Sequence, residues 1–386
     1  MNTHFKEQFD SLDPGVRIVV IHPNFAQQHI ALKYVLSSEN AAYLRLTGQA
    51  LTADDLDGQL KAAGIKLKSG MTLVLDECDR AAQDAIGPYL KDAVLTQIKQ
   101  GRVILLGRDV PVGLLDEPKL RAQMAFVPVD PDSMLVDYTK ARATGVHLLE
   151  VWGFGSGRVL IDGRPITNWD GVLPRALFFY FVDRGMTTRS EIFDAFWPNM
   201  QVREATNVFH VTKRKISEVL GIDLTLFSSG FYHLAPNLEL YYDVRLFNNL
   251  VQDSEVAEAD EAMTMLRKAL GLYRGSFVSG LDSPWAKLRR EQTAQAFGDA
   301  LVAQARLLEA QDNNGEALVL YSRAANLQPP RDDAMERVFE LAQALDRHND
   351  ALTIYHNFER YLREHLKIAP VVPLQQLAER AAAAIK

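Results

Sequence analysis

The sequence predicts a multidomain chain in which three parts are built differently. Short apolar runs that alternate with amphipathic segments predict an α/β domain with a parallel sheet over residues 1–130. Strand-like runs, three helical patterns and a hairpin pattern predict a small mixed domain over residues 146–236, behind a linker at 131–145. Amphipathic helices with an internal repeat predict an all-α domain over residues 237–386. A chain of 386 residues is expected to form two or three domains, since domains average roughly 150 residues.

Composition and charge restrict the classes of function. A net charge of -7 excludes a protein that binds nucleic acid over its whole surface, so any such contact must be local. The one cysteine, Cys78, excludes an internal disulfide framework. The polar amino terminus lacks the basic start and apolar run of a signal peptide, and no run reaches the ~18 apolar residues of a membrane span. We therefore expect a cytoplasmic protein.

The first domain contains four short apolar runs, RIVVIH, AAYLRL, TLVLDE and RVILLG, with MAFVPVD as a further strand candidate. The segments between them have helical patterns, which is typical of a parallel sheet with crossover helices. Ligands of such sheets bind beyond the carboxyl ends of the strands. The residues that such a site would use are therefore 22–25, 76–79 and 107–111.

Two known families resemble this domain, and the chain lacks key residues of both. LVLDECDRA followed by VILLGRDVP resembles P-loop regulatory ATPases of the signal-transducing type, where Asp76 and Glu77 would bind metal and orient water. However, the first turn reads HPNFAQQHIA, without the glycines and lysine that hold phosphate. A receiver domain with Asp76 as phosphoacceptor would need an acidic pair after RIVVIH and a lysine after AFVPV, which the sequence does not have. We expect a degenerate P-loop or receiver-like domain without nucleotide hydrolysis or phosphorylation, in which Asp76 and Glu77 end a buried strand.

The central domain opens with strands and turns. Residues 131–145, PDSMLVDYTKARATG, are polar and show little periodicity, which predicts a linker. After it, HLLEVWGFGSGRVLIDGRPITNW is interrupted by Gly-Ser-Gly and by Asp162-Gly163, a strong hairpin signal. This pattern predicts a small antiparallel sheet.

Three helices and a hairpin follow the sheet. VLPRALFFYFVDRG and TTRSEIFDAFWP are amphipathic, and Thr188 can cap the second of these helices. The third helix is predicted over residues 203–221. LTLFSSGFYHL after it predicts a hairpin whose turn holds Ser228, Ser229 and Gly230. A sheet, three helices and a terminal hairpin, in this order, predict a winged helix, in which the third helix enters the DNA major groove.

The third helix carries an apolar stripe and a cation-rich face. The stripe consists of Phe209, Ile216 and Leu220, with Ala205 and Val219 at its margin. The residues expected to face outward are Arg203, Asn207, His210 and Arg214. Arg, Lys and Asn side chains pair with guanine and adenine edges, and Val211 could contact a thymine methyl group. The alternative is that these basic residues only form a solvated face.

The rotation of this helix decides which lysine faces outward. A stripe centred on Val208 would expose Lys213 and half bury Lys215. A stripe centred on Phe209 would do the reverse. The predicted DNA-binding set is therefore the outward residues together with both lysines and the hairpin turn: Arg203, Asn207, His210, Val211, Lys213, Arg214, Lys215, Ser228, Ser229 and Gly230.

The central domain also resembles the effector domain of OmpR-like response regulators. The resemblance is to the form of this domain that stands at the amino terminus of bacterial transcriptional activators of the SARP-like family. The resemblance rests on EVWGFGSGRVLIDGRPI, on FWP at the end of the second helix, on VFHVTKRKISEVLG and on SSGFYHL. It implies a transcriptional regulator of the activator type that binds double-stranded DNA sequence-specifically. Lys213 departs from the family pattern, which is usually apolar there, and Ser217 and Glu218 replace residues that are often basic.

The resemblance also implies partners. In OmpR-like activators the loop between the second and third helices faces RNA polymerase, and here that loop contains Asn199, Met200 and Gln201. Met200 is an adaptable apolar side chain, which suits a protein contact but could equally pack in the core. Specific DNA-binding proteins often act as dimers. We therefore expect a homodimer on DNA, with half-sites about one helical turn of 10 to 10.5 base pairs apart.

The carboxyl-terminal domain contains an internal repeat. EALVLYSRA corresponds to DALTIYHNF, and the spacing of their alanines, Ala317 and Ala351, equals the tetratricopeptide period of about 34 residues. Each unit of such a repeat is a helix pair. AMTMLRKALGLYRG, from Ala262, resembles a further member out of phase. Tyr321 and Tyr355 are expected to pack in the core, and the concave side of the array to offer a protein or peptide platform.

The same region is similar to the bacterial transcriptional activator domain, from Tyr242 through LYRGSF and LDSPWAKLRRE to REHLKIAP. Elsewhere, no Cys/His spacing suits zinc, no G-x-S-x-G elbow occurs and the nine histidines are scattered, so we expect no enzyme, no metal and no cofactor. Two alternatives stay open: a nucleotide-dependent regulatory switch or ATPase based on the first domain, and a helical scaffold whose winged helix binds protein. Nucleotide binding by the first domain would favour the former. Salt-insensitive protein binding without DNA binding would favour the latter.

Overall fold

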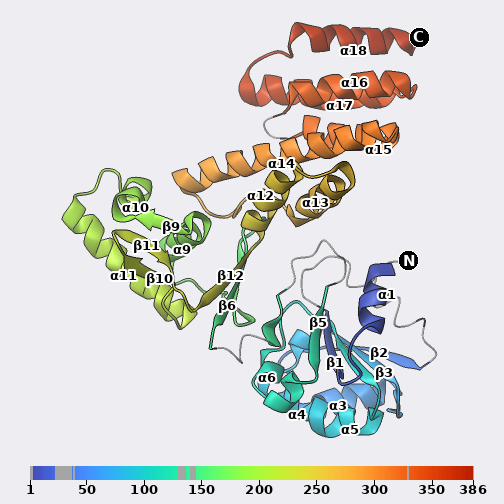
Figure 1. The fold of residues 1–386 in the computed structure, drawn as a ribbon, viewed down its shortest axis with the longest axis vertical. Coiled ribbons are helices and arrows are strands. Elements are labelled where there is room, and N and C mark those ends of the chain that lie inside the picture. The colour runs from blue at the N-terminus through green and yellow to red at the C-terminus, as the bar shows by residue number, and fades with distance from the viewer. Residues whose placement is uncertain are drawn as a thin grey trace. The chain divides into compact units, whose positions relative to one another are not determined.

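The structure is a computed structural model that describes residues 3–21, 37, 40–128, 136–139, 145–327 and 330–385 (Figure 1). The chain divides into two compact units. The first consists of residues 1–153 and 157–243, and the second of residues 154–156 and 244–386. Within the described ranges, no helix is both long and apolar enough to cross a membrane.

The first unit begins with a five-stranded parallel sheet, as the alternating pattern predicted. Its strands are β1 (Ile18–Ile21), β2 (Ala41–Arg45), β3 (Thr72–Asp76), β4 (Arg102–Leu105) and β5 (Met124–Val127). Val19, Val74 and Ile104 on its central strands are at most 1% exposed and belong to one core cluster. The strand order is β2-β3-β4-β1-β5. The receiver alternative is therefore wrong in its topology, because a receiver sheet has its first strand between the second and third.

Short helices surround this sheet (Figure 1). They are α1 (Thr3–Asp10), α3 (Ala53–Ala62), α4 (Gln83–Pro88), α5 (Leu95–Ile98), α6 (Val112–Leu115) and α7 (Pro118–Arg121). Helix α3 starts at a capping box, in which Thr52 and Asp55 each accept from the other's backbone amide. A short 3₁₀ turn, η1 (Cys78–Arg80), follows β3, and a π-helical turn, η2 (Tyr89–Val94), joins α4 to α5.

The described part of the expected linker is packed rather than free. Val136 and Tyr138 are 0% and 1% exposed. The Tyr138 ring lies edge-on to Phe126 of β5, with centroids 5.7 Å apart, and its hydroxyl donates to the buried carboxylate of Glu150. The Trp152 indole N–H donates to the same carboxylate, which satisfies a buried charge that would otherwise be costly. The polar pattern of 131–145 did not predict these two anchors.

A four-stranded sheet follows, made of β6 (His147–Trp152), β7 (Arg158–Ile161), β8 (Arg164–Pro165) and β12 (Leu238–Tyr242). Asp162 and Gly163 form the two-residue turn between β7 and β8, and their φ angles of 48° and 81° fit the type I′ turn that the sequence signal predicted. Strand β12 pairs in parallel with β6, so this sheet is not purely antiparallel. The helical region therefore begins at Asp243 and not at residue 237, because the strand that we assigned to it completes this sheet.

Three helices and a three-stranded sheet complete the unit. The helices are α9 (Val172–Arg184), α10 (Arg189–Phe196) and α11 (Val202–Leu220). The strands β9 (Met186–Thr188), β10 (Thr225–Ser228) and β11 (Phe231–Leu234) form a sheet in the order β10-β11-β9. Thr188 caps α10 as predicted, through a capping box with Glu191. Helix α9 is apolar on most sides rather than amphipathic, since the whole run 176–182 is buried.

The second unit is helical: α12 (Asp243–Ser254), α13 (Ala259–Leu272), α14 (Pro284–Ala310), α15 (Asn314–Ala325), α16 (Asp332–Ala344), α17 (His348–Tyr361) and α18 (Val372–Ala384), with a π-helical turn, η3 (Leu362–Leu366), after α17. Its backbone repeats with the period of the sequence. Helices α14 and α16 end one period apart, and α15 and α17 begin one period apart. The turns between these pairs contain Asp312 and Asp346, both in the left-handed region with φ of 58° and 56°. Tyr321 and Tyr355 are buried, as expected of packing residues.

Candidate nucleic-acid interface

The rotation of α11 follows the stripe centred on Phe209. The side chains of Ala205, Phe209, Ile216 and Leu220 are at most 5% exposed. Thr212 is 3% exposed and completes this stripe, although its polar side chain gave no apolar signal in the sequence. Its hydroxyl donates to the Val208 carbonyl one turn earlier at 2.7 Å, so the buried oxygen has a partner.

Phe209 fixes this rotation through contacts with three other elements. Its side chain is 0% exposed. The ring centroid lies 5.2 Å from that of Tyr232 on β11, 6.0 Å from Phe193 on α10 and 6.4 Å from Phe181 on α9. Aromatic pairs at such distances add to the free energy of apolar burial. The opposite face of α11 is therefore held in one orientation.

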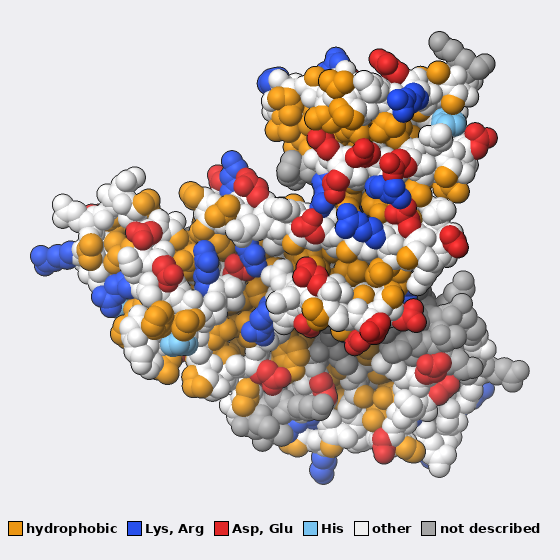
Figure 2. All heavy atoms as spheres, turned by 45° about the horizontal axis from the view of Figure 1, so that its top comes forward, with side chains coloured by type: hydrophobic (Ala, Val, Ile, Leu, Met, Phe, Trp, Pro, Cys, Tyr) orange, Lys and Arg blue, Asp and Glu red, His pale blue; other side chains and the backbone are white. Residues whose placement is uncertain are grey.

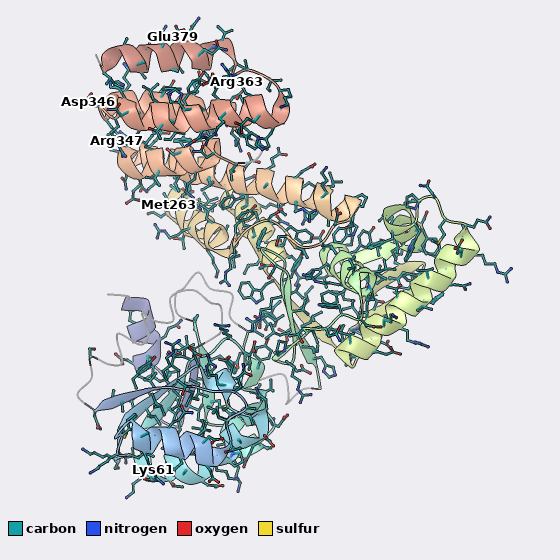
Figure 3. The ribbon with its side chains drawn as sticks, turned by 180° about the vertical axis from the view of Figure 1, so that it is seen from behind. Lys61, Met263, Asp346, Arg347, Arg363 and Glu379 are labelled. Carbon is teal, nitrogen blue, oxygen red and sulfur yellow. The ribbon has the colours of Figure 1, made fainter. Side chains whose placement is uncertain are left out.

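That opposite face presents the residues that the sequence predicted to point outward. All are exposed: Arg203, Asn207, His210, Val211 and Arg214. Side chains stand along the outer side of α11 throughout its length (Figure 3). Spacings of three and four residues place these groups in one row, because such positions are neighbours on a helix surface. The row combines a guanidinium group at each end with amide, imidazole and methyl groups between them.

Three cations of α11 interact with neighbouring side chains. Lys213 is half-buried, as the Phe209 rotation predicted, and its ammonium lies 5.9 Å from the centre of the Tyr232 ring. Lys215 was expected to be exposed and is instead half-buried, because its ammonium pairs with Asp170 at 2.8 Å. Arg214 Nε lies 3.2 Å from Glu218 one turn later. The pairing orients these groups without removing Arg214 from solvent.

Of the elements in this region, α11 carries the largest group of cations. Residues 146–243 contain nine Lys and Arg against eleven Asp and Glu, so the region as a whole carries no positive excess. Four of the nine cations, Arg203, Lys213, Arg214 and Lys215, lie on this one helix. Any attraction for a polyanion must therefore act through this helix, since the rest of the region would repel it.

The hairpin has the predicted turn at its tip, but apolar side chains that were not predicted are exposed beside it. Ser229 and Gly230 form a two-residue turn with φ of 52° and 87°, and Ser228 precedes it at the end of β10. The three residues are exposed. Beside them, Leu226, Phe227 and Phe231 are 52%, 49% and 36% exposed. The sequence reading assigned the tip only hydrogen-bonding groups and missed this apolar surface.

The three residues predicted to contact RNA polymerase lie in the loop before α11. Asn199 and Gln201 are exposed and Met200 is half-buried. A turn shapes the loop, in which the Met200 amide donates to the Trp197 carbonyl at 3.1 Å. Gln201 stands at the N-cap position of α11 but makes no side-chain capping bond. Its side chain is therefore dispensable for the helix start.

The acidic residues after β3 have structural partners. Asp76 accepts from the Tyr43 hydroxyl at 2.6 Å, and Glu77 accepts from the guanidinium groups of Arg45 and Arg80. The hydrogen bonds from Arg45 and then Arg80 lower the pKa of Glu77. Of the other predicted positions in this domain, 22–25 lie outside the described residues. Among the residues with described placement, no cluster of three or more His, Cys, Asp or Glu side chains could hold a metal ion.

Comparisons with known proteins give one family model and several similar proteins. Residues 242–381 match the family model of the bacterial transcriptional activator domain. The Regulatory protein AfsR of Streptomyces griseus is 24% identical over 197 residues, which are 50% of this chain and 20% of that protein. The Regulatory protein AfsR of Streptomyces coelicolor is 23% identical over 231 residues, which are 58% of this chain and 23% of that protein. The chain thus spans about a fifth of the length of these curated relatives.

The chain is also similar to a solved structure, that of Mycobacterium tuberculosis EmbR in complex with a low affinity phosphopeptide. The TM-score is 0.46 and the sequence identity is 19%, and the match covers 61% of this chain and 65% of that chain. The family model and the curated relatives agree with the motifs that the sequence contains. Residues 242–381 therefore match the bacterial transcriptional activator domain, and the chain is similar in sequence to two regulatory proteins of Streptomyces.

Proposed function

We propose that the chain is a sequence-specific, double-stranded DNA-binding regulator of transcription, of the activator type, which reads the major groove with α11. The observation that carries the proposal is the exposed row of Arg203, Asn207, His210 and Arg214 on a helix whose other face is fixed by Phe209. Arg pairs bidentately with guanine and Asn with adenine, and both need to be held at a fixed position to discriminate bases.

The elements around α11 support this proposal. A four-stranded sheet, three helices and a terminal hairpin follow one another in the order of a winged helix, which places a hairpin beside the groove-reading helix. The domain boundaries that we propose are 1–130, 131–145 and 146–236 with β12 added to the last of these, so that the helical domain starts at Asp243 rather than at residue 237. The repeat of α14 to α17 supports a tetratricopeptide-like architecture for the last domain.

Selection of bound duplexes from a random pool by the full-length protein tests the proposal. We expect enrichment of one motif, or of two motifs about 10 to 10.5 base pairs apart if two copies bind side by side. Binding should weaken steeply with salt, because cations that contact phosphates release counterions. A pool that stays random after repeated rounds contradicts sequence-specific recognition.

A second candidate function is protein binding by the winged-helix region. It is favoured by the exposed apolar side chains of the hairpin, Leu226, Phe227 and Phe231, because DNA-contacting surfaces are more polar and more cationic. Salt-insensitive binding of a protein, with no shift of any duplex, would support this alternative. The acidic residues after β3 give little support to a nucleotide-dependent switch, since Asp76 and Glu77 are engaged with Tyr43, Arg45 and Arg80.

Replacing the hairpin tip with carboxylates should weaken DNA binding. Ser228→Glu with Ser229→Glu is expected to cost roughly 1 kcal/mol, because two new negative charges would face phosphate or the minor groove. Both positions are exposed, so the fold should persist. Fluorescence anisotropy with the selected duplex measures the effect. The uncharged control is Ser228→Gln with Ser229→Gln. Equal affinity of the Glu and Gln variants would leave the hairpin without a DNA contact.

The loop before α11 should separate activation from DNA binding. We expect the double variant Met200→Ala and Gln201→Ala to bind the selected duplex normally while transcription with RNA polymerase falls about tenfold, the effect of a lost contact of about 1.4 kcal/mol. Normal DNA binding is expected because both residues precede the first residue of α11 and Gln201 makes no side-chain capping bond. Transcription in vitro and duplex affinity are measured on the same preparation. A parallel loss of both activities, or of neither, contradicts a polymerase contact at Asn199, Met200 and Gln201.

A further inference from the structure

A groove lies in the helical unit and is lined by no residue of α11. It has a volume of about 760 Å³ and lies between α14 and the segments that follow α15 and α17. Its apolar lining includes Leu288, Leu327, Tyr361 and Leu366. Leu288 and Leu366 are 54% and 45% exposed, which is unusual for leucines that face one hollow. On the face drawn in Figure 2, hydrophobic side chains of this unit are flanked by acidic and basic ones.

The groove lining follows the tetratricopeptide-like repeat. Leu327 and Tyr361 occupy equivalent positions of successive repeats, since they are one period apart. Asp299 and Asp333 are likewise one period apart. Arg331 joins these two carboxylates: it binds Asp333 at 3.0 and 2.8 Å and pairs with Asp299. Because equivalent side chains recur along the array, the groove offers repeated contacts to an elongated ligand rather than one enclosing site to a compact ligand.

The polar lining is acidic. It contains Glu291 and Asp299 against one cation, Arg331, whose guanidinium is shared with the further carboxylate of Asp333. Glu291 is exposed on α14, one turn from Leu288 on the same face of the helix. These carboxylates would repel an anionic ligand such as a nucleic acid. They would attract a cationic group that lies beside apolar anchors.

We propose that this groove binds an extended peptide segment of a partner protein that carries apolar anchor residues interspersed with lysine or arginine. The anchors occupy the apolar lining between Leu288, Leu327 and Tyr361, and a cationic side chain pairs with Glu291. The proposal does not depend on DNA binding by α11. It assigns the helical unit a partner of defined chemistry, while the winged-helix region determines the DNA site.

Fluorescence anisotropy of the full-length protein with short labelled peptides tests this assignment. The probes are a peptide in which Leu and Phe alternate with Lys, and its counterpart with Glu in place of every Lys. We expect the cationic peptide to bind at least about tenfold more tightly than the acidic one. Equal binding of the two peptides, or no binding of the cationic peptide, overturns the proposal.

Groove variants and matched controls locate the binding. Glu291→Lys and Leu288→Glu should each weaken the cationic peptide at least about tenfold. The controls carry the same changes at exposed positions outside the groove: Glu379→Lys on α18, labelled in Figure 3, and Val319→Glu on α15. They should leave the affinity unchanged. Equal weakening by the control variants would place the peptide elsewhere and reject the groove. Because all four positions are exposed, circular dichroism should confirm that each variant is folded.

Discussion

Replacing Arg214 with alanine is expected to weaken binding of the full-length protein to its selected duplex by about 1 to 3 kcal/mol, the usual cost of a lost bidentate base contact. His210→Ala should have an effect of the same kind, because His210 lies one turn before Arg214 in the exposed row of α11. Neither side chain anchors the helix, so the fold should persist. The affinities of wild type and variants for the selected duplex and for a random duplex are the quantities to compare.

The comparison with random DNA decides what Arg214 contacts. A loss confined to the selected duplex identifies a base contact, whereas an equal loss on both duplexes identifies a phosphate contact. Lys213 or Lys215, whichever reaches the DNA, should behave in the second way and lower the salt slope by about 0.9 when replaced by alanine. Arg267→Ala on α13, also exposed, is the matched control and should change neither affinity. If no α11 variant affects any duplex, the groove-reading helix has been assigned wrongly.

Much of the region around α11 could be predicted because its signals are local. A periodicity of about 3.6 residues placed Phe209 and Ile216 inside α11, and the glycine signals placed the turns at Gly163 and Gly230. Thr212 was missed because burial of a threonine depends on its bond to the Val208 carbonyl, which periodicity of apolar residues does not report. Lys215 was misplaced because its partner, Asp170, comes from the segment before α9, far from it in the sequence.

The contacts that depend on distant segments were the ones that the sequence did not reveal. Strand β12 pairs with β6, which lies at the other end of the central domain in the sequence. The residues of β12 were therefore assigned to the start of the helical region. Tyr138 looked like part of a polar linker because its partners, Phe126 and Glu150, lie on separate strands. Likewise, Glu77 follows an apolar run, which is a position where catalytic acids occur. Its partner Arg45 lies on β2, and this contact is visible only in the fold.

In the helical unit the repeat could be predicted but the groove could not. The period follows from matching Ala317 with Ala351, and the backbone carries the same period through α14 to α17. The groove depends on the leucines at 288 and 366 being left exposed, and these come from α14 and η3, which are distant in the sequence. A repeat pattern specifies which side chains pack between helices. It does not specify which apolar side chains remain uncovered.

Replacing Phe209 with alanine should destabilise the region around α11 by about 3 to 5 kcal/mol, the usual cost of removing a fully buried phenylalanine. Its ring contacts Phe181, Phe193 and Tyr232, so the cavity would open between three elements at once. Val211→Ala, on the exposed face of the same helix and 51% exposed, is the matched control and should change stability by less than about 0.5 kcal/mol. Urea unfolding followed by tryptophan fluorescence measures both, with Trp197 reporting locally because its ring lies 5.8 Å from that of Phe193. Since the chain has two units, the transition of this region should be resolved from that of the helical unit before the free energies are compared. Equal midpoints for the two variants would mean that α11 is rotated differently, and the row from Arg203 to Arg214 could then not be the DNA-reading face.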